Sequence, residues 1–361
     1  MTANVAANSG TRPVHAAHRF DKVALERWMT DHVAGFSGPL RVDQFNGGQS
    51  NPTYQLTTPA KRYVLRRKPS GPLLRGAHAI EREVRVMQAL GGTGFPVPRV
   101  HALCTNTDVI GVEFYIMDCV EGRIFWDGAL PEVPRDQRAA YLEAMAETLG
   151  VLHSFDPAAL GLADYGRPDR YLERQLARWT RQYVEDDAAP RNADMDFLAE
   201  WLPAHLPSEQ AARLVHGDYR IDNIVFHPDE PRIMAVLDWE LSTLGDPIAD
   251  LAYNLMMYRT AAFVPWGLAD RDLGSLGIPE EEDYVVAYSR CAGLATIPDL
   301  DVYLAYNFFR VAAILHGIKG RIIRGNAASS SAGAMVANLD KLARLGRQIA
   351  ERLPSGQGDQ T

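Results

Sequence analysis

The chain has 361 residues, of which 47% are hydrophobic and 23% are charged, a composition typical of a globular protein and not of a disordered or collagen-like one. Its formal charge of −8 argues against a nucleic-acid partner, because a general nucleic-acid-binding protein carries positive charge to neutralise phosphates. Three scattered cysteines favour a cytoplasmic protein without disulfides, and the sequence has no apolar run that would span a membrane.

The charge is unevenly divided along the chain. Residues 1–120 carry 14 Lys and Arg against 9 Asp and Glu, a net charge of +5, whereas residues 121–361 carry 23 against 36, a net charge of −13. Single cores rarely grow beyond about 300 residues, so a chain of this length usually forms two lobes. We therefore expect an N-lobe of residues 1–120 and a C-lobe of residues 121–361.

The N-terminal part is predicted to consist mainly of strands. The first twenty residues show no apolar stripe, which predicts a frayed N-terminus. Runs rich in β-branched and aromatic side chains, bounded by Gly, Pro and Asn, predict an antiparallel meander followed by two further strands. The expected strands are 41–45, 53–56, 62–66, 97–103 and 114–117, and the expected helices are 21–33 and 79–90.

The pattern becomes helical in the C-terminal part. Apolar side chains at helical spacing predict helices around 142–153 and 172–183, and a β-rich stretch at 214–237 precedes further helices. Asp246 is a good N-cap for the first of these, with a proline in the next position. Together the two parts predict an α+β fold with a small antiparallel β-rich N-lobe and a larger, mostly helical C-lobe.

The strongest chemical pattern lies in the β-rich stretch. Asp218 is followed five residues later by Asn223, and Asp238 comes fifteen residues after that, behind an apolar strand. Phosphoryl transfer uses one carboxylate to orient and deprotonate the attacking hydroxyl, and an amide oxygen with a second carboxylate to hold Mg²⁺. The spacing matches the catalytic loop of kinases, H-x-D-x-x-x-x-N followed by a metal-binding Asp.

On this loop, residues 216–223, the chain resembles the aminoglycoside phosphotransferase and choline kinase-like family, which has a two-lobed protein-kinase-like fold. The resemblance implies a phosphotransferase that depends on ATP and Mg²⁺. It implies Asp218 as the catalytic base, Asn223 as a metal ligand and Asp238 as the principal Mg²⁺ ligand. Each of these positions matches the family motif residue by residue.

Neighbouring residues of the loop carry further expectations. Arg220 stands where serine/threonine protein kinases have a lysine that contacts the transferred phosphate, so we hypothesise that it steadies the γ-phosphoryl charge. A salt bridge to Asp222 is the alternative. His216 is interpreted as a structural residue that hydrogen-bonds within the loop, and Asp250 resembles the acid that braces such a loop through its backbone.

A turn between the first two strands of the meander, Asn46-Gly-Gly-Gln-Ser-Asn51, lies where such folds place a loop over the phosphates. Gly47 and Gly48 would let backbone N–H groups approach phosphate, and Ser50 would add a hydroxyl. An ordinary hairpin turn is the alternative interpretation.

Alternate residues of the strand 62–66 and its extension share one face. Val64 would line the adenine and Arg66 would reach the α- and β-phosphates, although the family usually has a lysine at that position. Lys68 is the alternative phosphate contact, and a solvated basic edge is a third interpretation. Glu83 resembles the acid that pairs with the basic residue, and Glu81 is its alternative.

The segment that ends the last of these strands looks like the hinge of the family. Met117 would pack beside the adenine, and backbone groups of Asp118 and Val120 would hydrogen-bond its edge.

The acceptor is expected to be a small molecule. Asp238 is followed by Trp239-Glu240, and a capped helix begins only eight residues after Asp238, which leaves no room for a peptide-docking segment. Taken together, the Gly-Gly-Gln-Ser-Asn turn, the Arg-Arg-Lys-Pro segment and the loop 216–223 look most like the phosphotransferase-type domain associated with acyl-CoA dehydrogenases. That resemblance implies a hydroxyacyl-CoA or a related alcohol, rather than an aminoglycoside or a choline-like amine, and a functional link to an acyl-CoA dehydrogenase.

Two questions stay open at this point. Arg310, Arg321 and Arg324 fall near one face of the helix predicted at 302–324, where they would either grip an anionic acceptor or form an ordinary salt-bridged surface. The chain is also compatible with a non-catalytic, pseudokinase-type nucleotide-binding module that regulates a partner, because Arg66 replaces the usual lysine.

Overall fold

The structure is a computed structural model that describes residues 10–46, 51–69, 79–325 and 332–353. The chain divides into two compact units. Unit 1 comprises Met1–Ile124 with Asn223–Leu241, and unit 2 comprises Phe125–Asp222 with Ser242–Thr361. No helix within the described residues is long and apolar enough to cross a membrane.

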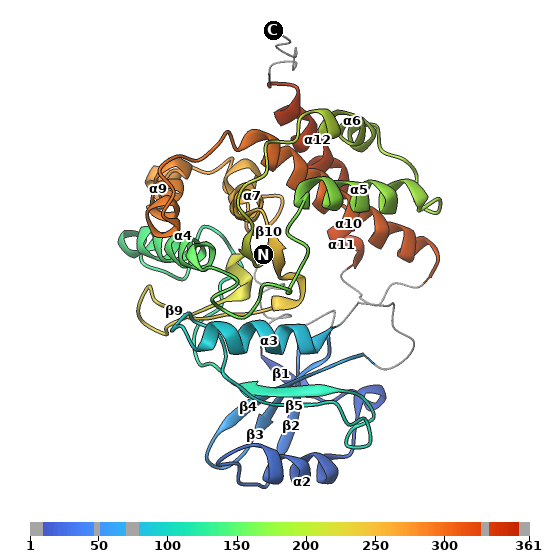
Figure 1. The fold of residues 1–361 in the computed structure, drawn as a ribbon, viewed down its shortest axis with the longest axis vertical. Helices are drawn as coiled ribbons and strands as arrows, with labels where there is room; N and C mark the ends of the chain where they lie inside the picture. The colour runs from blue at the N-terminus through green and yellow to red at the C-terminus, as the bar shows by residue number, and fades with distance from the viewer. Residues whose placement is uncertain (1–9, 47–50, 70–78, 326–331, 354–361) are drawn as a thin grey trace. The chain divides into compact units, whose positions relative to one another are not determined.

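Unit 1 is built on one six-stranded antiparallel sheet, whose strands follow the order β1-β2-β3-β4-β6-β5 (Figure 1). The strands are β1 (Thr11–Pro13), β2 (Arg41–Phe45), β3 (Thr53–Thr57), β4 (Arg62–Arg67), β5 (Val100–Cys104) and β6 (Phe114–Asp118). Four of the five expected strands are therefore found with at most one added residue, and β5 begins three residues later than expected.

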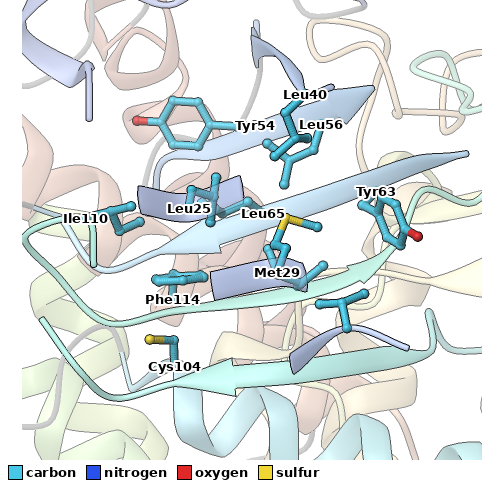
Figure 2. Close-up of a cluster of buried hydrophobic side chains, with 12 residues drawn as sticks. Leu25, Met29, Leu40, Tyr54, Leu56, Tyr63, Leu65, Cys104, Ile110 and Phe114 are labelled. Atoms are coloured by element: carbon cyan, nitrogen blue, oxygen red, sulfur yellow. The ribbon is translucent and has the colours of Figure 1, made fainter. Parts of the chain in front are cut away.

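The helices α2 (Lys22–His32) and α3 (Ile80–Gly91) lie on opposite faces of this sheet (Figure 1). Strand side chains alternate between the two faces. On the face of α2, Leu25 and Met29 pack with Leu65 and Phe114 in a buried apolar cluster, which Figure 2 shows. Arg66, the residue after Leu65, consequently lies on the face of α3.

The N-terminus differs from the expectation. Thr11–Pro13 forms the edge strand β1, in which Thr11 pairs with Phe45 and Pro13 with Asp43, so the predicted fraying is wrong for these residues. All three side chains are exposed, and they therefore left no apolar pattern. Pro13 fits because an edge strand does not need every N–H group.

A short hairpin from later in the sequence completes unit 1. Its strands are β8 (Ile224–Phe226) and β9 (Ile233–Val236), and the 3₁₀ turn η5 (Trp239–Leu241) follows. The backbones of Arg123 and Phe226 exchange two hydrogen bonds of 2.8 Å, and the N–H of Val236 donates to the carbonyl of Pro96. These contacts group residues 223–241 with the N-terminal unit, whereas the expected division at residue 120 assigned Asp238 to the C-lobe.

Unit 2 is mostly helical. Its longest described helix, α10 (Asp301–Ile323), packs against five others, and α4 packs against α9 (Figure 1). The remaining helices are α4 (Arg138–Ser154), α5 (Tyr171–Glu185), α6 (Ala193–Trp201), α7 (Pro247–Arg259), α8 (Leu273–Leu276), α9 (Glu281–Ala292), α11 (Ala332–Val336) and α12 (Leu339–Ala350). Two short strands, β7 (Arg213–Val215) and β10 (Thr243–Gly245), pair antiparallel. Asp246 caps α7 as predicted, since its carboxylate accepts the N–H of Ile248.

Arg310 and Arg324, two of the three arginines expected on one face of α10, have different partners. Arg310 is buried, with 8% of its surface exposed, and its guanidinium lies over the ring of Tyr253. Arg324 follows the helix as its exposed cap and pairs with Asp186 at 2.6 Å. Arg310 is therefore part of the interior of unit 2, whereas Arg324 forms a surface salt bridge, which was the alternative interpretation.

Candidate functional site

Unit 1 gathers three carboxylates around one guanidinium. Arg66 on β4 lies 2.7 Å from Asp238 and 3.2 Å from Glu240 through its Nη2 atom. Its Nε atom lies 3.1 Å from Oε2 of Glu83 on α3, a close ion pair without the alignment of a hydrogen bond. The expected pairing of Arg66 with Glu83 is thus present in the structure, whereas the contact of Arg66 with phosphates stays a prediction.

Burial makes this cluster electrostatically unusual. Glu83 is 2% exposed, and its burial raises the pKa of the carboxyl to about 7, although Arg66 and a 2.9 Å hydrogen bond from Tyr115 act to lower it. Burial acts to lower the pKa of Arg66, but the surrounding acids, Asp238 first, raise it above its ordinary value. Arg66 therefore remains charged, while Glu83 titrates near neutral pH.

Lys68 has its own partners. Its ammonium group pairs with Glu81 at 3.1 Å and with Glu113. Lys68 and Glu81 were the alternatives to Arg66 and Glu83. In the structure they pair with each other, and Arg66 is the basic residue that faces Glu83.

The hairpin β8–β9 brings the two predicted metal ligands to one end. Ile224 pairs with Val236, and the N–H of Leu237 donates to the carbonyl of Asn223 at 2.8 Å, so Asn223 and Asp238 flank the paired strands. Asp238 adopts a left-handed backbone conformation with φ of 64°, which is costly for a residue other than glycine and typical of functional positions.

The donor set fits a hard divalent cation. Asn223 and Asp238 offer amide and carboxylate oxygens, which Mg²⁺ prefers, and a bound Mg²⁺ would take its other ligands from phosphates and water. The excess of carboxylates over the single guanidinium of Arg66 also favours a cation. Within the described ranges no group of three or more His, Cys, Asp or Glu side chains is placed to hold a metal ion.

The predicted adenine contacts lie next to each other. Val64 and Met117 are direct cross-strand partners on β4 and β6, and both are buried. Asp118 differs from the expectation in part, because its N–H donates to the carbonyl of Arg99 and is therefore not available to an adenine. Val120 follows β6 and is half-buried.

The side chain of Asp118 has partners of its own. Burial acts to raise the pKa of the Asp118 carboxyl, but hydrogen bonds from Lys61 and His101 lower this pKa below its ordinary value. The predicted phosphate contacts Gly47, Gly48 and Ser50 lie outside the described residues.

Unit 2 holds the predicted catalytic loop rigidly. Asp250 is 4% exposed, and its carboxylate accepts the N–H groups of His216 at 2.7 Å and of Gly217 at 2.9 Å. His153 lies 3.3 Å from the same carboxylate. Burial acts to raise the pKa of Asp250, but these partners lower this pKa below its ordinary value, so the carboxylate stays charged. Gly217 has a φ of 82°, which favours glycine, and the brace expected from Asp250 is present.

Two side chains contact the carboxylate of Asp218. The hydroxyl of Tyr253 donates to its Oδ1 atom at 2.5 Å, and Nε of Arg220 lies 3.2 Å from the same oxygen. Burial, together with the charge of Asp218, raises the pKa of Tyr253, so the phenol remains a proton donor. Arg220 also pairs with Asp222 at 3.1 Å, the alternative that the sequence left open. Arg310 donates to the carbonyl of Gly217 at 2.6 Å.

No role was predicted from the sequence for Tyr253 or Tyr115, and Arg310 was expected only on a helix face that grips the acceptor or forms salt bridges. Asn51 and Glu240 stood in motifs without a role of their own. Tyr253 could have been found, since it lies three residues after Asp250 and shares its helix face. The others are reached only through packing between distant segments.

Comparison with known proteins places the chain in a family. Residues 41–284 match the model of the phosphotransferase enzyme family, and the chain belongs to that family. Acyl-CoA dehydrogenase family member 11 of Gallus gallus is 44% identical over 360 residues, which cover 97% of this chain and 46% of that protein. Family member 10 of Mus musculus is 43% identical and covers 95% and 32%. The chain therefore spans less than half the length of these curated relatives.

Solved structures confirm the fold. A crystal structure from Ralstonia eutropha JMP134, described as a candidate aminoglycoside phosphotransferase, is 45% identical with a TM-score of 0.84, and covers 93% of this chain and 100% of that one. A choline kinase from Cryptosporidium parvum is 12% identical with a TM-score of 0.62 over 92% of this chain and 97% of that one. The predicted kinase-like α+β fold is thus confirmed.

Proposed function

We propose that the chain is an ATP- and Mg²⁺-dependent phosphotransferase that moves the γ-phosphoryl group to a hydroxyl of a small molecule. The observation that carries the proposal is the orientation of Asp218, whose loop backbone is clamped by Asp250 and whose carboxylate is held by Tyr253. A general base is effective only when its oxygen is fixed toward the hydroxyl that it deprotonates.

In the proposed reaction Asp218 accepts the proton of the acceptor hydroxyl. The acceptor oxygen forms a bond to the γ-phosphorus, the bond from that phosphorus to the oxygen it shares with ADP breaks, and ADP leaves. Arg66, oriented by Glu83, would hold the α- and β-phosphates, and Arg220 would steady the transferred group. Asn223 and Asp238 would hold Mg²⁺, which when bound neutralises charge on the phosphate oxygens.

One solved structure with this fold holds an adenine nucleotide, and this supports ATP as the donor. A spectinomycin phosphotransferase solved with ADP and spectinomycin has a TM-score of 0.62 to this chain at 10% identity. That similarity concerns the fold alone, so the nucleotide remains part of the proposal.

We further propose a hydroxyacyl-CoA or a related alcohol as acceptor, in preference to an aminoglycoside or a choline-like amine. The support is the 44% identity to part of a protein named as an acyl-CoA dehydrogenase. A chain that acts together with such a dehydrogenase would receive or supply its acyl-CoA compounds, so a functional link to an acyl-CoA dehydrogenase belongs to the same proposal.

The acceptor can be identified by thermal shift. Candidate alcohols and hydroxyacyl-CoA derivatives are screened with a non-hydrolysable ATP analogue and Mg²⁺, because a ligand of the native state raises the unfolding temperature. ³¹P NMR then follows transfer from ATP to each stabilising compound. A phosphorylated product supports the proposal, whereas nucleotide binding without transfer to any acceptor supports the rival, a pseudokinase-type module that regulates a partner.

A further inference from the structure

Asn51 is a buried amide in the middle of the charged cluster of unit 1. It is 1% exposed, and its Nδ2 atom donates to Oε1 of Glu83 at 3.2 Å and to Oε2 of Glu240 at 3.4 Å. A hydrogen bond from its neighbour Thr53 to its carbonyl at 3.0 Å fixes its backbone where β3 begins. The amide therefore has one orientation in which its donors meet both acids.

The same two acids hold Arg66. Glu83 divides its oxygens, since Oε1 accepts from Asn51 while Oε2 lies against Nε of Arg66. Glu240 uses one oxygen, Oε2, for Nδ2 of Asn51 and for Nη2 of Arg66. Asn51, Glu83, Arg66 and Glu240 thus form a closed ring of four side chains, which we call the Asn51 ring.

We infer that Asn51 is a positioning residue, which fixes the guanidinium of Arg66 toward the nucleotide phosphates by holding the two acids beside it. This inference rests on the proposed function. An amide suits the task because it satisfies carboxylate oxygens without adding a second positive charge that would compete with Arg66 for them. Without it, Glu83 and Glu240 lose a shared donor and the guanidinium loses a defined direction.

The test compares Asn51→Ala with the wild-type chain. Isothermal titration calorimetry measures the dissociation constant for adenylyl imidodiphosphate with Mg²⁺. We expect it to rise about tenfold in the variant, since hydrogen bonds to charged groups contribute about that factor or more. In steady-state assays the KM for ATP should rise with it, while the KM for the acceptor alcohol should not change.

Two further variants keep the test decisive. Asn51→Asp preserves the volume of the side chain and should weaken nucleotide binding at least as much, because it replaces a donor by a further carboxylate. Gln44→Ala is the matched control, since Gln44 is another buried amide of unit 1 that contacts His18 and not the ring. It should lower the unfolding temperature at most, with wild-type nucleotide affinity.

A double-mutant cycle separates positioning from general support. If Asn51 acts through Glu240, the loss of affinity in Asn51→Ala/Glu240→Ala is smaller than the product of the two single losses. Independent losses, or wild-type affinity in Asn51→Ala and Asn51→Asp, would overturn the inference. A wild-type chain that binds no nucleotide would instead overturn the proposed function on which it rests.

Discussion

The buried acid of α3 makes stability depend on pH in a defined direction. Burial raises the pKa of Glu83 from 4.5 to about 7, so between these values the native chain keeps a proton that the unfolded chain releases. The native state then binds more protons, and the free energy of unfolding falls as the pH rises. From about pH 5 to about pH 8 this one group lowers stability by about 2.5 kcal/mol, at 1.36 kcal/mol for each unit of pKa difference.

Glu83→Gln removes this contribution, because the amide does not titrate. Equilibrium urea unfolding at the two pH values should give a smaller fall in stability for Glu83→Gln than for the wild-type chain, by about 2.5 kcal/mol. Glu81→Gln on the same helix is the control, since its side chain is 51% exposed, and it should retain the wild-type fall. Equal falls in all three chains would refute the burial argument for Glu83.

Two further predictions concern unit 2. Asp250→Ala leaves two buried loop N–H groups without their acceptor and should lower the free energy of unfolding by about 3 kcal/mol. The control is Asp272→Ala, which removes an exposed helix cap and should lower the free energy of unfolding by about 1 kcal/mol. Similar thermal unfolding of the two variants would contradict the role of Asp250 as a brace of the loop. Tyr253→Phe removes the donor to Asp218 and should lower kcat about tenfold with unchanged nucleotide affinity, as one hydrogen bond to a carboxylate accounts for that factor. An unaltered kcat would show that Tyr253 does not orient the base.

Local patterns were sufficient to predict most strands of the sheet. The strand β2 runs from Arg41 to Phe45 as expected, because the turn residues that begin at Asn46 mark its end. Helix α7 begins after Asp246, as predicted, because the residues that cap a helix are adjacent in the sequence and can be recognised there. In contrast, Thr11–Pro13 has only exposed side chains, so its pairing depends on backbone hydrogen bonds that no pattern of residue types records.

Contacts between distant segments could not be predicted in the same way. The motifs indicated Arg66 and Glu83 as partners, but they gave no sign that Asp238 and Glu240, more than 170 residues further along, would share the guanidinium. The placement of residues 223–241 in unit 1 has the same origin, since it follows from hydrogen bonds to Arg123 and Pro96. Tertiary packing decided these features, and residue types alone do not encode it.

The central claim is that Asp218 serves as the base of a Mg²⁺- and ATP-dependent transfer to an alcohol. The most direct measurement is the rate of phosphoryl transfer to the acceptor found by thermal shift, compared between the wild-type chain and Asp218→Asn. General-base catalysis contributes about 10²–10⁴-fold, so we expect a loss of that size in Asp218→Asn with nearly unchanged calorimetric affinity for ATP. Equal transfer rates in the two chains would contradict the claim.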